Sequence, residues 1–185
     1  MSKASKIVVL CEDQAHEVFA LRFLKTGWKI KSRHITVVAY PSGKGSGKKF
    51  VEEKLANEVA ALRKRHATTI LIVMRDADED SVDEALRKLE SKIQPRRQAD
   101  EKIAFVVPKW HIQTWFGYLD GMEIDESEKE IYKRAYGSIS GTKQAHIHVD
   151  KLTGWCRKRQ ALESPTNSLE RACEEFERIR NALGE

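Results

Sequence analysis

Two apolar runs in the chain, residues 6–11 and 69–74, are each followed directly by carboxylates. The acids after the first run are Glu12 and Asp13, and those after the second are Asp76, Asp78, Glu79 and Asp80. Residues at i and i+2 of an extended segment point to the same side. Asp76 and Asp78 are therefore expected to present their carboxylates together, with only the small Ala77 between them.

Carboxylates that lie close together repel one another unless a cation or a proton offsets the cost. A hard divalent cation meets this requirement, and Mg²⁺ typically uses one or two carboxylates together with water and phosphate oxygens. We therefore predict a site for Mg²⁺, with Mn²⁺ as the alternative ion, formed by Glu12, Asp76 and Asp78. The competing interpretation is that the acids only favour the N-termini of the helices that follow them, and this explains Asp80 well.

The apolar pattern predicts the elements that would position these acids. Short runs rich in branched residues predict buried strands at 6–11, 35–39, 69–74 and 103–107. Helical spacing predicts helices over 14–23 and 50–65, one after Asp80 or Ser81, and others near 110–119, 127–135 and from about 143 and 168. Alternating strands and helices are typical of a parallel sheet, whose ligands gather at the carboxyl ends of the strands.

The predicted fold class is α/β, with a four-stranded, mainly parallel sheet flanked by helices. We assign residues 1–122 to this domain and residues 123–185 to a helical C-terminal extension packed on it. Among the 185 residues, 41% are hydrophobic and 33% are charged, which suits one core with a polar surface. Because no run approaches the roughly 20 apolar residues that span a bilayer, and the N-terminus does not resemble a signal peptide, we expect a cytoplasmic protein without a membrane partner.

The net charge of +5 mildly favours a polyanionic partner such as DNA or RNA. Polyanions are held by clusters of basic side chains, and Lys44, Lys48 and Lys49 lie in one glycine-rich loop. We predict that these lysines contact backbone phosphates. The loop is not a Walker A loop, because three residues rather than four separate Gly43 from the next Gly-Lys pair, and Lys49 stands in the hydroxyl position.

An apolar strand ending in Glu, followed much later by one ending in Asp-x-Asp, resembles the Toprim domain of topoisomerases, primases and nucleases related to the OLD family. The matching segments are IVVLCE at residues 7–12 and ILIVMRDAD at residues 70–78, and the resemblance covers roughly residues 5–120. The short single-domain form is similar to the small RloB-like Toprim proteins of prokaryotic defence loci. The loop at 43–47 and the segment VVPKWHIQTWF at 106–116 support this subgroup.

The resemblance implies a Mg²⁺-dependent nuclease or nickase that hydrolyses phosphodiester bonds in DNA or RNA, in a phage-defence setting. Asp76 and Asp78 would hold the metal, and Glu12 would act as a general acid/base or a further ligand. An ABC-type ATPase is an implied partner, because small Toprim proteins of this kind often stand beside one. Residues with accessory roles under this hypothesis are Asp13, Glu17, Asp80, His111 and Gln113.

The chain departs from the family pattern at three positions. Asp13 replaces the glycine that commonly follows the Glu, His16 replaces an acid four residues after it, and Gln113 replaces a Glu that precedes the Trp. Gln113 and the missing glycine after Glu12 slightly favour a second hypothesis, a non-catalytic module that binds metal or nucleic acid or regulates an effector. A third hypothesis is an enzyme acting on a phosphorylated small molecule, since flavodoxin-like sheets also use acids at strand ends. The number of metals and the oligomeric state stay open.

Overall fold

A computed structural model of the chain describes residues 4–41, 46–65 and 68–184. Its four strands form one sheet in the order β2-β1-β3-β4, with all neighbouring strands parallel. The strands are β1 (Lys6–Cys11), β2 (Ile35–Ala39), β3 (Thr69–Met74) and β4 (Ile103–Val106). The predicted α/β class with a parallel sheet is therefore confirmed, and the first three strands have the predicted bounds.

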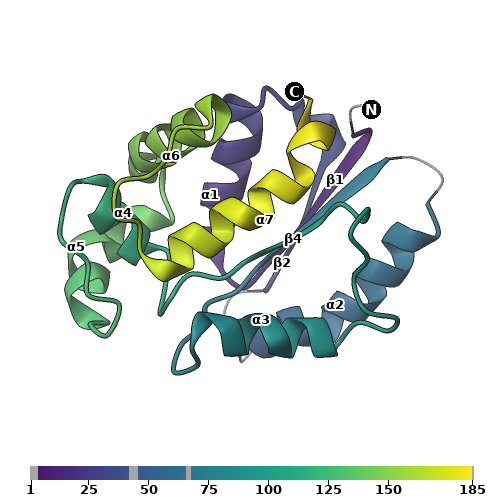
Figure 1. The fold of residues 1–185 in the computed structure, drawn as a ribbon, viewed down its shortest axis with the longest axis horizontal. Coiled ribbons are helices and arrows are strands. Elements are labelled where there is room, and N and C mark those ends of the chain that lie inside the picture. The colour runs from purple at the N-terminus through teal and green to yellow at the C-terminus, as the bar shows by residue number, and fades with distance from the viewer. Residues whose placement is uncertain (1–3, 42–45, 66–67, 185) are drawn as a thin grey trace.

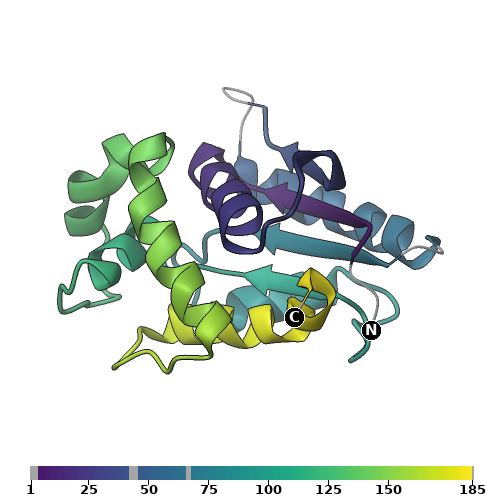
Figure 2. The same cartoon turned by 90° about the horizontal axis from the view of Figure 1, so that it is seen from above.

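Seven α-helices lie in the described part of the chain, and they cover both faces of the sheet. They are α1 (Gln14–Arg22), α2 (Gly47–Arg63), α3 (Val82–Ser91), α4 (Gln113–Leu119), α5 (Glu130–Ser140), α6 (His146–Lys158) and α7 (Asn167–Leu183). Helices α2 and α3 cover one face, and α1, α6 and α7 lie on the other (Figure 1). The view from above places α4 and α5 together at one end of the molecule, beside α6 (Figure 2). No helix in the described ranges is long and apolar enough to cross a membrane.

Strand side chains alternate between two apolar cores. Val9 and Ile72 face the core under α1 and α7, whereas Val8, Leu10 and Val73 face the core under α2 and α3. Every residue of β3 is buried. Burial on both faces explains why the strands read as continuous apolar runs in the sequence.

Helix α7 packs along the sheet edge and shares the core of the N-terminal elements. Phe176 stacks on Phe23 with ring centroids 4.5 Å apart. The side chain of Glu175 accepts a hydrogen bond of 2.8 Å from the backbone N–H of Phe105 in β4. A free sheet edge exposes unpaired backbone groups, so α7 both buries apolar surface and pairs part of this edge.

Capping residues set where the helices near the strand ends begin. Ser81 caps α3 in a complete capping box with Glu84, so Ser81 rather than Asp80 is the cap. Ser46 accepts from the backbone N–H of Lys49, and α2 therefore starts at Gly47 rather than at the predicted Phe50.

Candidate functional site

The sheet register brings the two acid-bearing strand ends together. Cys11 pairs with Met74 in the β1–β3 ladder, and the backbone N–H of Glu12 donates to the Met74 carbonyl at 3.1 Å. The Glu12 carboxylate oxygen Oε2 then accepts a hydrogen bond of 2.9 Å from the backbone N–H of Asp76. The predicted proximity of Glu12 and Asp76 is thus present as a direct contact.

Asp76 is buried beside an equally buried histidine. Its Oδ1 atom lies 3.0 Å from Nε2 of His16 in α1, and the His16 side chain is only 1% exposed. Within the described ranges, neither Oδ1 nor the ring nitrogens of His16 meet hydrogen-bond geometry, so the contact is an ion pair. Asp13 caps α1 by accepting from the His16 backbone N–H at 2.8 Å, which holds this helix start in place.

The crowding of these groups shifts their pKa values. Burial, together with the charge of Asp76, raises the pKa of Glu12 to about 7. Burial also raises the pKa of Asp76, although His16 opposes this. Burial lowers the pKa of His16, but the charges of Asp76 and Asp13 outweigh it and raise that pKa to about 9. His16 is therefore a cation near neutral pH, set directly against Asp76.

Asp78 lies two residues after Asp76, in the loop between β3 and α3, and has a left-handed backbone conformation with φ of 55°. Its Oδ2 atom is 3.3 Å from Nζ of Lys48. The loop is held by Lys109, whose Nζ donates to the backbone carbonyls of Asp78 at 2.6 Å and of Asp80 at 2.7 Å. Asp tolerates a left-handed backbone better than most residues. The hydrogen bonds from Lys109 hold this backbone in place, and Lys48 holds the Asp78 carboxylate.

Asp80 belongs to a network of ion pairs that Lys48 links to Asp78, since its Nζ atom lies 3.5 Å from Asp80 and 3.3 Å from Asp78. It accepts from Lys88 at 2.6 Å and lies 3.4 Å from the fully buried guanidinium of Arg75, which also pairs with Glu52. The hydrogen bond from Lys88 lowers the pKa of Asp80. These contacts make Asp80 and Arg75 supports of the loop rather than free ligands.

The lysines expected to contact phosphates differ in their surroundings. Lys48 points at Asp78, and Lys49 is exposed at the surface, 3.8 Å from Glu53. Lys44 lies outside the described residues. The structure therefore brings one of these lysines, Lys48, directly to the acids.

Gly47 is a site residue that the sequence did not single out. A Cβ atom at this position would lie 2.3 Å from the Glu12 carbonyl oxygen and 2.6 Å from its Cγ. Only glycine lets the first turn of α2 pack directly on Glu12. The positive end of the helix dipole therefore lies beside this acid. The glycine-rich loop was the signal for this contact, although it was attributed to phosphate binding.

His111 and Gln113 lie between the strand ends and α5. The Nε2 atom of His111 is 3.0 Å from the Lys129 carbonyl, and Nε2 of Gln113 donates to Ser140 Oγ at 2.7 Å. Burial lowers the pKa of His111, and Asp76 opposes this shift. In the described structure, His111 Nδ1 and Gln113 Oε1 are buried without a hydrogen-bond partner. His111 therefore borders the acidic site, and the side chains of both residues contact the α5 region.

Glu17, the remaining accessory candidate, lies in the first turn of α1. Burial, and then the charge of Glu17, raise the pKa of the Cys11 thiol to about 12. Glu17 thus lies near the end of β1, and its backbone N–H donates to the Asp13 carbonyl at 3.1 Å.

The donor set fits a weakly held, hydrated cation. Across residues 4–41, 46–65 and 68–184, no three His, Cys, Asp or Glu side chains are already grouped to hold a metal ion. Mg²⁺ needs only one or two carboxylates, and the buried Oδ1 of Asp76 has no hydrogen-bond partner there. In this structure Lys48 pairs with Asp78 and His16 pairs with Asp76, so these two residues supply the positive charge that a bound cation would supply. Lys48 would therefore compete with a bound cation for Asp78.

Comparison of the chain with protein-family models, with curated proteins and with solved structures gives no match. The fold and the site define an α/β protein with half-buried and buried carboxylates at the carboxyl ends of its two central strands.

Proposed function

We propose that this protein is a Mg²⁺-dependent nuclease or nickase that hydrolyses phosphodiester bonds in DNA or RNA, with Mn²⁺ as an alternative ion. The observation that carries the proposal is the contact between the carboxylate of Glu12 and the backbone of Asp76, at the carboxyl ends of adjacent parallel strands. Ligands of open α/β sheets bind at this edge.

Asp76 and Asp78 would hold the metal, which when bound polarises a phosphodiester and stabilises charge on its oxygens. Glu12 is the group suited to proton transfer. It is half-buried, and its pKa of about 7 lets it hold or release a proton near neutral pH. Its hydrogen bond to the Asp76 backbone and its contact with Gly47 fix its position.

The basic residues around the site supply the contacts to the polyanion. Lys49 is exposed, and Lys48 can exchange Asp78 for a backbone phosphate once the metal is bound. The net charge of +5 adds a general attraction that salt would screen. The resemblance of the sequence to Toprim proteins supports extending the proposal to cytoplasmic phage defence, with an ABC-type ATPase as partner.

A second candidate function is a non-catalytic module that binds metal or nucleic acid or regulates an effector. The observation that favours it is the internal neutralisation of the site, since His16 pairs with Asp76 and Lys48 pairs with Asp78. A site whose charges are already balanced gains less from a metal ion.

Cleavage of supercoiled plasmid and of RNA, with Mg²⁺ or Mn²⁺, tests the proposal. The wild type is compared with Asp76→Asn/Asp78→Asn and with a matched control, Asp100→Asn/Glu128→Gln, which removes two exposed carboxylates elsewhere. We expect metal-dependent nicking or degradation that the control retains and the site variant loses.

Metal binding, measured by calorimetry on the same proteins, separates the remaining outcomes. A wild type that binds metal or nucleic acid without cleaving either substrate supports the second candidate. Cleavage that persists in the site variant, or a wild type that binds neither metal nor nucleic acid, would show that these carboxylates are structural.

A further inference from the structure

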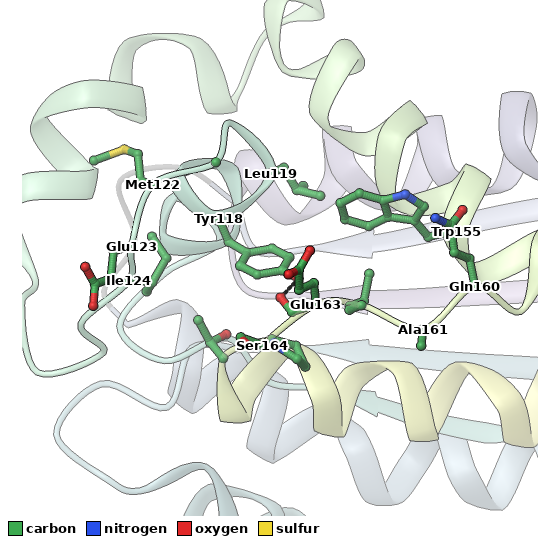
Figure 3. A pocket seen from close by; sticks show the side chains of 14 residues that line it. Tyr118, Leu119, Met122, Glu123, Ile124, Trp155, Gln160, Ala161, Glu163 and Ser164 are labelled. Atoms are coloured by element: carbon green, nitrogen blue, oxygen red, sulfur yellow. Dashed lines mark hydrogen bonds between the residues drawn. The ribbon is translucent and has the colours of Figure 1, made fainter.

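A half-open cavity of about 800 Å³ lies away from the acidic strand ends, between the end of α4, the connector after it and the segment that joins α6 to α7 (Figure 3). Cavities of this size are typical of ligand sites. None of Glu12, Asp76 and Asp78 lines it. It is therefore separate from the proposed nuclease site.

The floor of the cavity is apolar and partly aromatic. Its main apolar contributors are Tyr118, Leu119, Ile124, Trp155, Leu162 and Pro165. Trp155 and Tyr118 pack edge to face, with ring centroids 6.2 Å apart. Met122 lies at the rim and is 38% exposed, one of the largest apolar exposures in the described structure. Aromatic and methionine side chains of this kind are frequent anchors of protein interfaces.

The wall formed by residues 160–166 is held in place rather than left free. The hydroxyl of Tyr118 donates to the backbone carbonyl of Glu163 at 2.6 Å, a contact drawn as a dashed line in Figure 3. The backbone N–H of Gln160 donates to the Trp155 carbonyl at 3.1 Å. Arg159, the C-cap of α6 just before this wall, and Ser164 within it adopt positive φ, of 51° and 45°. A preformed groove loses less conformational entropy when a partner binds.

The charge of the groove is opposite in sign to that of the whole chain. Glu123 and Glu163 line it, and in the described structure neither carboxylate has a hydrogen bond or an ion pair. Asp125 and Glu126 line the adjoining hollow. No Lys, Arg or His is among the described residues that line either one. In a chain with 33 Lys and Arg residues and a net charge of +5, this is an unusual concentration of acids.

We propose that this groove is a docking site for a segment of a partner protein in which a lysine or arginine lies beside an apolar side chain. The apolar floor removes one side chain from water, and the free carboxylates of Glu123 and Glu163 pair with its cationic neighbour. The same carboxylates repel DNA and RNA. Partner docking and polyanion binding are thus assigned to different parts of the surface.

Three labelled hexapeptides, acetylated and amidated, test the proposal by fluorescence anisotropy with the full chain. One alternates lysine with leucine, one alternates glutamate with leucine, and one alternates lysine with glycine. We expect saturable binding of the lysine–leucine peptide alone. Glu123→Gln/Glu163→Gln weakens it at least about fivefold, because two rim charges are lost, and Met122→Ser weakens it about threefold, because an exposed apolar contact is lost.

The matched control is Glu53→Gln/Asp100→Asn, which removes the same charge from exposed positions outside the groove. Equal weakening in the control and the groove variant would overturn the proposal, since binding would then follow net charge alone. Binding of the lysine–glycine peptide with equal affinity, or self-association of the free chain that the groove variants abolish, would also overturn it. Because none of these residues lies in the acidic strand-end site, the result is independent of the nuclease proposal.

Discussion

The carboxylate of Glu12 accepts a hydrogen bond from the backbone N–H of Asp76 at 2.9 Å, across 64 positions of sequence. The contact orients one acid by the backbone of the other and leaves the Asp76 carboxylate free to face His16. Two acids at neighbouring strand ends thus have different environments. Groups whose pKa values are shifted in this way gather at functional sites.

Replacing Glu12 by glutamine tests its role as the proton-transfer group. The amide oxygen of Glu12→Gln can still accept from the Asp76 backbone, whereas the titrating proton is lost. We expect cleavage to fall by about 10²–10⁴-fold. The free energy of unfolding should match that of the wild type below pH 4.5 and exceed it above pH 7, where only the wild type carries a charge at this position. Initial nicking rates and urea unfolding of the same variant provide the two measurements.

The companion variant Glu12→Ala removes the acceptor as well. It leaves the Asp76 backbone N–H without this partner and is expected to destabilise the fold by about 1–3 kcal/mol. Unchanged nicking in Glu12→Gln would exclude Glu12 from the chemistry. Equal stability of the two variants would show that the hydrogen bond contributes little.

The stability of the metal-free protein should fall as pH rises through two windows. Glu12 has a pKa raised from 4.5 to about 7, and His16 has one raised from 6.5 to about 9. A raised folded-state pKa gives stability that is complete below the unfolded value and is lost as pH rises through the folded value. Glu12 therefore accounts for the window from 4.5 to 7, and His16 for the window from 6.5 to 9.

Urea unfolding in the presence of EDTA, repeated across both windows, measures this dependence. Glu12→Gln should reduce the pH dependence in the lower window, to which the raised pKa of Asp76 also contributes, and His16→Gln should remove the upper window, because each variant deletes one titrating group. A wild-type stability that rises with pH between 6.5 and 9 would contradict the ion pair between His16 and Asp76.

The strands and their order along the chain were readable from the sequence because each strand is buried on both faces. Continuous branched runs mark such strands without any tertiary information. The start of α4 was misjudged for a tertiary reason. Trp110 has φ of 62°, which breaks the predicted helix, and the adjacent Lys109 is held by the carbonyls of Asp78 and Asp80. Contacts between residues about 30 positions apart, such as those of Lys109 with Asp78 and Asp80, leave no pattern in the local sequence.

The candidate site was predictable only in part. Parallel strands end at one edge, so the approach of Glu12 to Asp76 followed from the fold class. The counter-charges did not follow, because His16 and Lys48 reach Asp76 and Asp78 from α1 and α2. Gly47 was missed for a similar reason, since its packing on Glu12 depends on how α2 lies against the sheet.

Gly47→Ala should destabilise the protein although alanine favours helices. The new methyl group would lie 2.3 Å from the Glu12 carbonyl oxygen, a backbone atom that cannot move aside alone. We expect a loss of about 1–3 kcal/mol in the free energy of unfolding, as for other overpacked sites, and a shift of Glu12 that lowers any cleavage. The matched control is Gly154→Ala in α6, where nothing lies within 4 Å of the added atom. That variant should be stabilised by up to about 1 kcal/mol, and equal effects at the two positions would contradict the packing argument.

Lys48→Gln tests whether a metal ion and Lys48 compete for Asp78. The ammonium group lies 3.3 Å from the Asp78 carboxylate and 3.5 Å from that of Asp80, so it opposes an arriving divalent cation. Its removal should tighten Mn²⁺ binding about three- to tenfold, as expected for one partly exposed charge pair. Nucleic-acid binding should weaken at the same time and become less dependent on salt.

Lys49→Gln is the control, since Lys49 is 77% exposed and pairs only weakly with Glu53. Calorimetric titration of both variants with Mn²⁺ decides the question, because a metal affinity unchanged in Lys48→Gln would mean that Asp78 is not a ligand.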